Sequence, residues 1–361
     1  MTDSNNCSIF IFKVGSLGDS IVSLPAIRKI NDYYGGELHF ITNKPSEGVI
    51  SAWEVYKLTN YFKDCFEFEY SLKSIIRLRK FIQKEKGKRV LFYFADISSF
   101  RRNFRNYLFF RILGITVIYG WKECTGDYIE RDSSGRLIEV IPEYKRLVNI
   151  VDKYLDKKNN HLENTNYITF DSAIVEKISL ESSFINNEFI VLGIGGKTDI
   201  QKWSIFNYVE TLKYLSEEIA VIILGGASDY DDAERVQEQL PQLKIFNLCA
   251  RTSIQESAYI LSKAILYIGN DTGTAHLAGI VKTRCVVITS GRDNLERWTP
   301  FGDYHVIIRK RTDCEGCSLS SSEDCEFNVK CMNEIDIKDV KKKLFTALRN
   351  EVEHDLQSEI I

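Results

Sequence analysis

A short polar loop in the last third of the chain carries residues well suited to bind an anion. The apolar run 264–268 before it predicts a buried strand, and the small apolar residues after it predict a closely packed helix. The loop and the first helical turn contain Asp271, Thr272, Gly273 and His276. Backbone N–H groups are unpaired at a helix N-terminus, where the helix dipole also attracts phosphate. We therefore expect an anion site here, with helix capping by Asp271 and Thr272 as the alternative role.

A carboxylate near the N-terminus is the second group that could do chemistry. The run 8–14 has the composition of a strand, residues 15–20 form a glycine-containing turn, and residues 21–30 show helical spacing. Asp19 is thus expected at the carboxyl end of the first strand, and helix capping is again the alternative role. The glycines lack the spacing of a dinucleotide-binding loop and of a P-loop, so neither kind of site is indicated.

Two further glycine turns follow predicted strands in the second half of the chain. Gly195 and Gly196 form the first turn, and Lys202 follows them closely. Gly225 and Gly226 form the second turn, which leads into an acidic helix. Glycine lets a phosphate approach the backbone, and lysine neutralises a diphosphate as a point charge. The turns are therefore candidate phosphate sites. A carboxylate of the acidic helix could hold ribose hydroxyls, although a solvated face accounts for most of its charges.

Basic residues dominate the segment 73–111, which contains twelve Lys and Arg but only two acidic residues. Within it, Arg101, Arg102 and Arg105 are interleaved with Phe, Tyr and Leu. Such a mixture suits a membrane surface or an anionic, phosphorylated acceptor. The alternative is a solvated helix face whose aromatic side lies in the core.

Strand and helix patterns alternate along the chain, which predicts an α/β fold with doubly wound parallel sheets. Because 361 residues exceed what one core usually holds, two domains are expected. The boundary is placed near 175–187, where loop-like composition precedes a new strand. This gives domains at 1–180 and 181–335, followed by a C-terminal helical segment at 336–361.

Composition and charge narrow the classes of protein. A net charge of −3 argues against nucleic-acid binding by the molecule as a whole. Only the basic segment could bind nucleic acid, and this hypothesis predicts an affinity that falls steeply with salt. The polar first residues contain no positively charged leader, and the apolar run behind them is too short to span a bilayer. A cytoplasmic protein is therefore expected.

Four of the nine cysteines are crowded into one polar segment, at Cys314, Cys317, Cys325 and Cys331. Four thiolates can bind zinc or iron tetrahedrally, and a metal would help a segment with so little apolar content to fold. Free thiols are the alternative, and disulfides fit a reducing compartment less well. We expect any metal here to be structural and not catalytic.

Three stretches, taken together, resemble the lipopolysaccharide heptosyltransferases of glycosyltransferase family 9. Their order and spacing match the family from one end of the chain to the other. The stretches are Gly15-Ser-Leu-Gly-Asp19 with Pro25-Ala26, then Gln201-Lys202-Trp203, then Asp271-Thr-Gly273-x-x-His276-Leu-Ala with the later Arg297-Trp298-x-Pro300-x-Gly302.

The resemblance implies the GT-B fold, in which two Rossmann-like domains face each other across a cleft. The N-terminal domain would hold the acceptor and the C-terminal domain the nucleotide sugar. Asp19 would be the general base of an inverting transfer, with Lys202 on the donor's phosphates. The expected donor contacts are Gly195, Gly196, Lys202, Gly225, Gly226, Asp271, Thr272, Gly273 and His276. With the basic segment included, the expected acceptor contacts are Gly18, Arg101, Arg102 and Arg105.

The function implied is a cytoplasmic, metal-independent glycosyltransferase that needs no cofactor. It would move a sugar, with heptose from ADP-heptose as the first expectation, onto a lipopolysaccharide or other surface-glycan acceptor. The enzyme could associate peripherally with the inner membrane. The loop at 290–293, Ser-Gly-Arg-Asp, departs from the Gly-Pro-Thr type of better-known members, so the donor sugar could differ. The alternatives are a relative that uses another nucleotide sugar or a protein acceptor, and a nucleotide-sugar-binding module without turnover.

Overall fold

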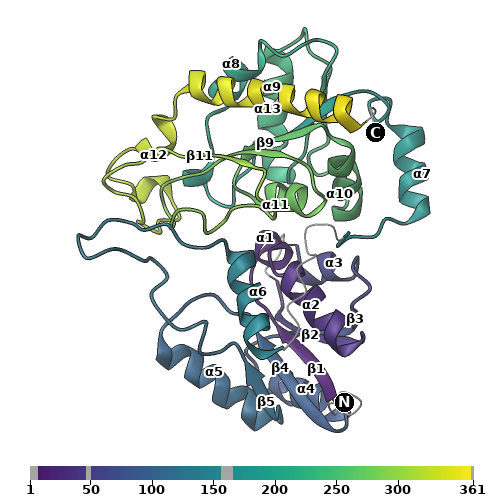
Figure 1. The fold of residues 1–361 in the computed structure, drawn as a ribbon, viewed down its shortest axis with the longest axis vertical. Coiled ribbons are helices and arrows are strands. Elements are labelled where there is room, and N and C mark those ends of the chain that lie inside the picture. Colours follow the sequence, from purple (N-terminus) through teal and green to yellow (C-terminus); the bar gives the residue numbers. More distant parts are fainter. Residues whose placement is uncertain (1–6, 46–49, 156–165, 359–361) are drawn as a thin grey trace. The chain divides into compact units, whose positions relative to one another are not determined.

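The computed structural model describes residues 7–45, 50–155 and 166–358. The chain forms two α/β units, each with its own parallel sheet (Figure 1). The first unit comprises Met1–Glu130 and Ile141–Thr169, and the second comprises Arg131–Val140 and Phe170–Ile361. The chain therefore passes into the second unit for one short segment before it returns to complete the first.

The first unit contains a five-stranded sheet in the order β3-β2-β1-β4-β5, with every pairing parallel. Its strands are β1 (Cys7–Phe12), β2 (Leu38–Asn43), β3 (Phe62–Phe68), β4 (Lys88–Tyr93) and β5 (Val117–Tyr119). Its helices are α1 (Leu17–Ile21), α2 (Leu24–Tyr34), α3 (Ala52–Tyr56), α4 (Leu72–Lys84), α5 (Phe100–Leu113) and α6 (Glu143–Tyr154).

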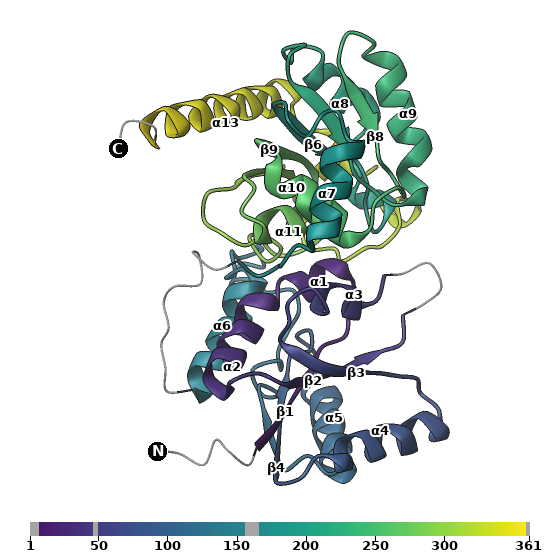
Figure 2. The same ribbon diagram turned by 90° about the vertical axis from the view of Figure 1, so that its right-hand side faces the viewer.

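Alternation along β1 and its partner strands directs aromatic side chains to both faces of the first sheet. Phe12 packs against Phe110 of α5 with ring centroids 4.9 Å apart, while on the other face Phe92 of β4 meets Tyr34 of α2 at 6.4 Å. Accordingly, α2 and α6 lie on one side of this sheet and α4 and α5 on the other (Figure 2). Both faces are covered, as expected for a doubly wound parallel sheet.

The second unit contains a six-stranded parallel sheet in the order β11-β10-β9-β6-β7-β8. Its strands are β6 (Phe189–Gly193), β7 (Ala220–Ile223), β8 (Ile245–Asn247), β9 (Leu266–Asn270), β10 (Cys285–Ile288) and β11 (Val306–Ile308). Its α-helices are α7 (Ser172–Glu181), α8 (Ile205–Leu212), α9 (Tyr230–Gln239), α10 (Ile254–Lys263), α11 (Gly273–Ile280), α12 (Lys330–Asn333) and α13 (Ile337–Ser358).

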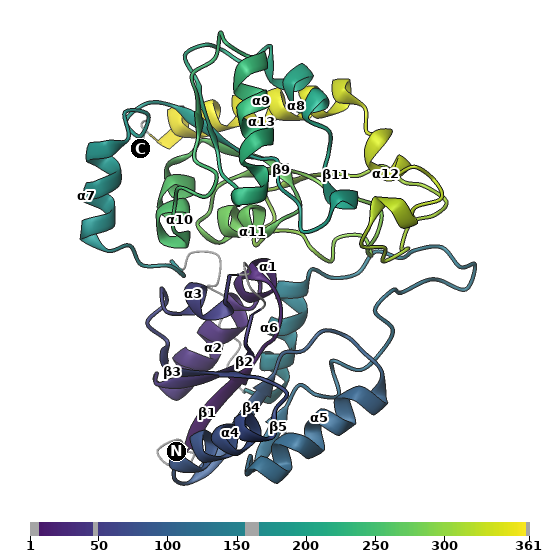
Figure 3. The same ribbon diagram turned by 180° about the vertical axis from the view of Figure 1, so that it is seen from behind.

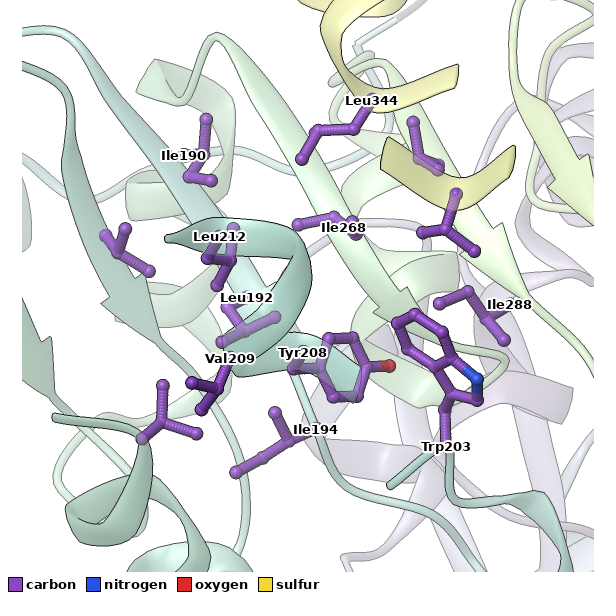
Figure 4. Close-up of a cluster of buried hydrophobic side chains, with 14 of the residues drawn as sticks. Ile190, Leu192, Ile194, Trp203, Tyr208, Val209, Leu212, Ile268, Ile288 and Leu344 are labelled. Carbon is purple, nitrogen blue, oxygen red and sulfur yellow. The ribbon is translucent and has the colours of Figure 1, made fainter. Parts of the chain in front are cut away.

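The core of the second unit lies between the sheet and the helices α8, α9 and α13. Figure 4 shows the part of it formed by the strands, α8 and α13. Ile190, Leu192 and Ile268 contribute from the strands, and Leu344 from α13. All four side chains are fully buried. The remaining helices α10 and α11 pack against each other, and α7 lies beside α10 (Figure 3). This second sheet is therefore also covered on both faces.

The division between the units falls between Thr169 and Phe170, one helix before the expected boundary near residue 180. The physical reason is α7, whose Lys177 forms a 2.7 Å ion pair with Glu256 of α10. The expected C-terminal segment is the helix α13, which packs on α8 and the second sheet and so belongs to the second unit.

None of the helices within the described residues is both long enough and apolar enough to cross a membrane.

Candidate functional site

The turn after β1 holds Asp19 in a fixed hydrogen-bonded position. Asp19 lies in the short helix α1, and its Oδ2 accepts hydrogen bonds from the backbone N–H and the hydroxyl of Ser16, both at 2.6 Å. Gly15 has a φ of +143°, and a Cβ there would lie 2.6 Å from the Asp19 side chain. Only glycine fits this conformation and this close approach. Asp19 therefore does cap its helix, and Gly18, next to it, is buried in the same turn.

A buried lysine lies behind this turn and was not foreseen from the sequence. The Lys13 side chain is fully buried, and its Nζ lies 3.4 Å from Asp96, which follows β4. Burial lowers the pKa of Lys13, but the charges of Asp96, Asp19 and Glu143 outweigh it, and the pKa is raised overall. Lys13 is therefore a permanent cation whose charge interacts with Asp19. The available signal was a single charge inside the apolar run 8–14, since a buried lysine requires paired anions.

A second buried ion pair completes this network. Arg146 of α6 binds Glu143 through two hydrogen bonds, of 2.6 and 2.7 Å, and donates to the backbone oxygen of Ala95 at 3.2 Å. The bidentate geometry makes the pair strong and directional. Glu143 and Arg146 lie outside every motif, so nothing in the sequence singled them out.

The expected acceptor arginines lie on the first turns of α5. Arg101, Arg102 and Arg105 are all exposed. The helix begins after Ser99, whose hydroxyl accepts from the N–H of Arg102 at 3.5 Å. Because α5 follows β4 and α1 follows the neighbouring β1, both helices begin at the carboxyl edge of the first sheet.

In the second unit, the expected donor residues gather at one edge of the sheet. The strands β9, β6 and β7 are neighbours, and each ends in one of the predicted loops. Asp271 follows β9, Gly195 and Gly196 follow β6, and Gly225 and Gly226 follow β7. The carboxyl edge of a parallel sheet is where such folds bind ligands.

Asn270 connects these loops, and no sequence motif had marked it as a site residue. Its Oδ1 accepts from the N–H of Trp203 at 3.0 Å and from the hydroxyl of Tyr208 at 2.8 Å. Its Nδ2 donates to the carbonyl oxygens of Ile194 and Gly195 at 2.8 and 2.9 Å. The side chain is fully buried. One amide therefore fixes the end of β9 against the turn after β6 and the segment that carries Lys202.

Lys202 is positioned by its neighbours in the sequence and by one carboxylate. Trp203 is fully buried against Tyr208, with ring centroids 5.0 Å apart (Figure 4), which anchors the segment. The Lys202 Nζ lies 3.1 Å from Asp229 Oδ1. Asp229 Oδ2 accepts from the N–H of Gly226 at 3.0 Å. The carboxylate in contact with the glycine turns is thus Asp229, which precedes the acidic helix suggested by the sequence.

Three of the four glycines in these turns leave no room for a side chain, because Asp229 or Lys202 approaches them closely. A Cβ on Gly195 would lie 2.5 Å from Asp229 Oδ2, and one on Gly225 would lie 2.8 Å from the same atom. A Cβ on Gly196 would lie 2.8 Å from Lys202 Cγ. The backbone at these positions is therefore packed against the Lys202–Asp229 pair.

The loop after β9 leads directly into α11. Thr272 is the N-cap residue of this helix, and Gly273 begins it. His276 is buried on its first turn, and its Nε2 lies 3.5 Å from Asp271 Oδ1. Its Nδ1 is buried and has no hydrogen-bond partner among the described residues. His276 thus turns one nitrogen toward Asp271.

The later motif 297–302 packs against this helix. The Trp298 ring lies edge-on to His276 with centroids 6.2 Å apart. A Cβ on Gly279 would lie 2.8 Å from the side chain of Pro300 and 2.9 Å from the backbone nitrogen of Phe301. The motif therefore supports α11 from behind, which explains why it accompanies the loop.

A pocket of about 210 Å³ lies beside this loop, within the second unit. Asp271, Thr289, Asp293, Trp298 and Arg309 are among its lining residues. Burial lowers the pKa of Arg309, whose guanidinium donates to the Asp293 backbone oxygen at 2.6 Å. The lining combines carboxylates, a hydroxyl, an indole and a guanidinium, which suits a polar ligand.

The comparison with known families settles what kind of protein this is. The sequence model of glycosyltransferase family 9 (heptosyltransferase) matches residues 107–326, which is more than half of the chain. The chain belongs to this family. It is a heptosyltransferase-like glycosyltransferase, and the predicted family and enzyme class are confirmed.

Solved structures agree with the family assignment. The ADP-heptose lipopolysaccharide heptosyltransferase II of E. coli is 15% identical with a TM-score of 0.63, and the match covers 95% of this chain and 99% of that one. A family 9 glycosyltransferase from Veillonella parvula is 14% identical with a TM-score of 0.67, covering 96% and 98%. The iron-containing dodecameric glycosyltransferase TibC of enterotoxigenic E. coli is 11% identical with a TM-score of 0.52, covering 95% and 76%.

Because these sequence identities are low, the structural matches support a shared fold. Together with two parallel sheets in an α/β arrangement they give this glycosyltransferase the GT-B fold, as predicted. Among curated proteins, none matches the chain.

The loop at 290–293 joins two parts of the second unit. Arg292 donates to the side chain of Gln201 at 3.4 Å and to the backbone oxygen of Ser318 at 3.2 Å. The Gly291 carbonyl accepts from the N–H of Gly316 at 2.6 Å. The loop therefore connects the segment before Lys202 with the segment that carries the cysteines.

The cysteine segment lies close to this loop. A Cβ on Gly291 would approach the Cys331 Cβ to 3.0 Å. Burial raises the pKa of the Cys331 thiol, and so do the nearby Cys314, Cys317 and Cys325. All four are free cysteines, and Cys325 Sγ accepts from the N–H of Val329 at 3.3 Å. Within the described residues, no three His, Cys, Asp or Glu side chains are arranged to hold a metal ion. The thiols are thus neighbours without the geometry of a four-thiolate site, which the sequence offered as one alternative beside free thiols.

Proposed function

We propose that this glycosyltransferase is an inverting enzyme that moves heptose from ADP-heptose onto a lipopolysaccharide or other surface-glycan acceptor. The observation that carries the proposal is the gathering of the glycine turns, Lys202 and the Asp271 loop at the carboxyl ends of three neighbouring strands. A nucleotide diphosphate is the ligand such an edge suits, because it offers backbone donors and a cation together. The choice of ADP-heptose is supported by the E. coli heptosyltransferase II, which is named for that donor.

In this proposal, the donor binds through its diphosphate to Lys202 and to the backbone around Gly273. Lys202 is held by Asp229 at 3.1 Å, so its ammonium is already oriented when the donor arrives. Charge develops on the leaving diphosphate as the bond to the sugar breaks, and a fixed cation and backbone donors stabilise that charge. Gly195, Gly196, Gly225, Gly226, Asp271, Thr272 and His276 complete the proposed donor site.

The proposed general base is Asp19, with Lys202 as the second catalytic residue. Asp19 takes the proton of the acceptor hydroxyl while that oxygen forms its bond to the anomeric carbon. The bond between the anomeric carbon and the diphosphate oxygen breaks at the same time, ADP leaves, and the configuration inverts. The hydrogen bonds from Ser16 hold the carboxylate in place, and the charge of the buried Lys13 attracts it.

The acceptor is proposed to bind the first unit, near Gly18 and the basic helix α5. Arg101, Arg102 and Arg105 are exposed and can meet anionic groups of a phosphorylated glycolipid. We place the enzyme in the cytoplasm, with a peripheral association at the inner membrane where such acceptors lie.

Transfer is proposed to need no metal or other cofactor, because Lys202 and backbone donors supply the charge stabilisation. A structural zinc or iron at the four cysteines is a separate hypothesis, supported by TibC, which is an iron-containing glycosyltransferase. The thiols would have to rearrange to bind it, since the described residues contain no ready ligand set. Element analysis of the purified protein decides this point.

The loop at 290–293 supports a second candidate function within the same class. Arg292 contacts Gln201, which lies next to Lys202, so the departure from the family pattern lies close to the donor residues. A different nucleotide sugar, or a protein acceptor, would fit such a change. A nucleotide-sugar-binding module without turnover is the non-enzymatic alternative.

The test is a panel of nucleotide sugars, including ADP-heptose, with binding measured by calorimetry and donor hydrolysis by release of the nucleoside diphosphate. We expect the tightest binding for ADP-heptose. Tighter binding of another donor with measurable release supports the second candidate, and binding without release supports the non-enzymatic module. Binding that survives Lys202→Ala unchanged removes Lys202 from the donor site.

A further inference from the structure

A line of exposed apolar side chains runs along α5. Phe100, Phe104, Leu108 and Ile112 are spaced four residues apart, so they lie on one side of the helix. Their exposed fractions are 57%, 40%, 43% and 72%. Single exposed apolar residues need no explanation, but a continuous line of four on one helix marks an interaction surface.

Further aromatic rings extend this line at its first half. The Trp121 ring lies 6.1 Å from both Phe100 and Phe104 and 4.9 Å from Tyr107, measured between centroids. Trp121 and Tyr107 are both half-buried. Tryptophan and tyrosine are enriched at membrane–water interfaces, because their rings are amphipathic. The surface thus combines deeply apolar side chains with interfacial ones.

The charge on this part of the molecule has one sign. The helix α4 carries five Lys and Arg, α5 carries four Arg, and neither helix contains an acidic residue. All nine cations are exposed. The first turns of α4 also expose Leu72 and Ile76. Both helices therefore combine exposed cations with exposed apolar side chains.

The two helices belong to one surface. They pack against each other on the same side of the first sheet (Figure 2). A Cβ on Gly114, just after α5, would lie 3.5 Å from Gln83 near the end of α4. We call the exposed residues of α4 and α5 together the α4/α5 surface.

We propose that the α4/α5 surface docks on an anionic lipid bilayer. The apolar line enters the headgroup boundary, and the nine cations contact lipid phosphates, which is how basic amphipathic helices lie on membranes. This inference deepens the proposed function, because it names the surface that brings the enzyme to a lipid-linked acceptor. It assigns Arg101, Arg102 and Arg105 to anionic lipid headgroups, of which such an acceptor would be one.

The charge of the α4/α5 surface distinguishes an anionic bilayer from the two other partners considered, a second copy of the chain and a nucleic acid. In a symmetric dimer the same surface meets itself, so nine cations would oppose nine cations without acidic partners. A nucleic acid would satisfy the cations but leave Leu108 and Ile112 in contact with phosphates or water. An anionic bilayer satisfies both the charges and the apolar line.

The test uses the full chain and vesicles, without donor or acceptor, so that its outcome is independent of the transferase proposal. Co-sedimentation is measured with vesicles of phosphatidylcholine alone and with added phosphatidylglycerol. We expect binding only to the anionic vesicles, and a loss of affinity of about tenfold or more in the double variant Phe104→Ser, Leu108→Ser, because two apolar side chains that enter the bilayer are lost. The variant Arg101→Gln, Arg105→Gln is expected to weaken binding and reduce its salt dependence.

The matched control is Phe206→Ser on α8 of the second unit, which removes a phenyl ring that is 63% exposed. It is expected to bind vesicles as the unchanged chain does. Circular dichroism and thermal unfolding confirm that each variant is folded. Absence of vesicle binding by the unchanged chain overturns the inference, and so does equal binding by the Phe104→Ser, Leu108→Ser variant. Salt-sensitive binding to duplex DNA that is stronger than binding to vesicles assigns the surface to nucleic acid instead.

Discussion

Asp19, Asn270 and His305 show how single polar side chains control this molecule. Asp19 receives two hydrogen bonds from Ser16 at one oxygen, so its carboxylate is oriented before any substrate binds. Asn270 makes four hydrogen bonds from a fully buried position. His305 receives a hydrogen bond from Cys285 N–H at 3.1 Å. Each side chain therefore supports a separate prediction.

Replacing Asp19 tests the proposed general base. Asp19→Asn keeps an oxygen that can accept from Ser16, so the fold should be retained, while the proton acceptor is lost. We expect donor turnover or transfer to fall by about 10²–10⁴-fold with nucleotide-sugar binding little changed. Asp32→Asn on the exposed side of α2 serves as the control. Full turnover in Asp19→Asn would show that another group takes the proton.

Removing the Asn270 amide should damage stability and donor binding together. Asn270→Ala leaves the Trp203 N–H, the Tyr208 hydroxyl and two carbonyls without this partner. Because buried unpaired groups are costly, we expect a loss of about 3–5 kcal/mol in unfolding free energy, measured by denaturant titration. Asn207→Ala on α8 removes a half-buried amide and should cost under about 1 kcal/mol. Equal losses in both variants would contradict this role.

His305 should make the second unit less stable in acid. Burial lowers its pKa to about 4, although the Phe301 carbonyl, 2.8 Å from Nε2, acts in the opposite direction and raises the pKa. Nδ1 accepts a hydrogen bond from Cys285 N–H, which requires this nitrogen to be unprotonated. Arg284 and His276 lower the pKa further, and Asp303 opposes them. Since the unfolded chain binds this proton below about pH 6.5, stability should be full above that pH and fall by up to about 3 kcal/mol toward pH 4.

The measurement is unfolding free energy across this pH range for the unchanged chain and for His305→Asn. Asparagine offers an acceptor in place of Nδ1 but does not titrate. The variant should therefore lose less stability between pH 6.5 and 4, even if it is less stable at neutral pH. Identical slopes for the two proteins would exclude His305 as the source of the acid sensitivity.

At the scale of elements, α11 depends on the motif that packs behind it. The approach of Pro300 and Phe301 to Gly279 leaves no room for a side chain. Gly279→Ala should therefore push the motif away and destabilise the second unit by about 1–3 kcal/mol, as overpacking usually does. Thermal unfolding measures this. Gly226→Ala, where the nearest atoms to a new Cβ are 3.9 Å away, is the stability control. A neutral effect at Gly279 would show that the motif adjusts freely.

The sequence predicts these elements well in segments where the apolar residues follow a single periodicity. Apolar runs such as 264–268 gave the strands, and glycine turns marked where the strands end. The sequence did not predict the contacts between segments that are far apart in the chain. Asn270 is the last residue of β9, and its four partners are separated from it by up to 76 residues. Lys13 was visible as a charge in a strand, but its partner Asp96 is 83 residues away. Hydrophobic periodicity predicts which face of a strand or helix a residue occupies, but it does not predict which residue the side chain contacts on that face.

At the scale of the whole molecule, the chain's two units should respond differently to the nucleotide. The proposed donor residues all lie in the second unit, so ADP should bind there without needing an acceptor. A ligand at 100 times its dissociation constant stabilises the folded state by about 2.7 kcal/mol. We therefore expect ADP to slow amide hydrogen exchange at the turns after β6, β7 and β9, and at the start of α11.

Hydrogen exchange with mass spectrometry tests this on the full chain, with and without ADP. Amides of the turn around Asp19 should exchange at the same rate in both conditions, because the nucleotide has no proposed contact in the first unit. Lys202→Ala should remove the protection in the second unit, whereas Lys213→Ala, at the exposed C-terminal end of α8, should keep it. If ADP slowed amide exchange only in the first unit, the nucleotide would bind near the proposed acceptor residues. The donor and acceptor roles of the two units would then be reversed, since one bound ADP cannot occupy both sites.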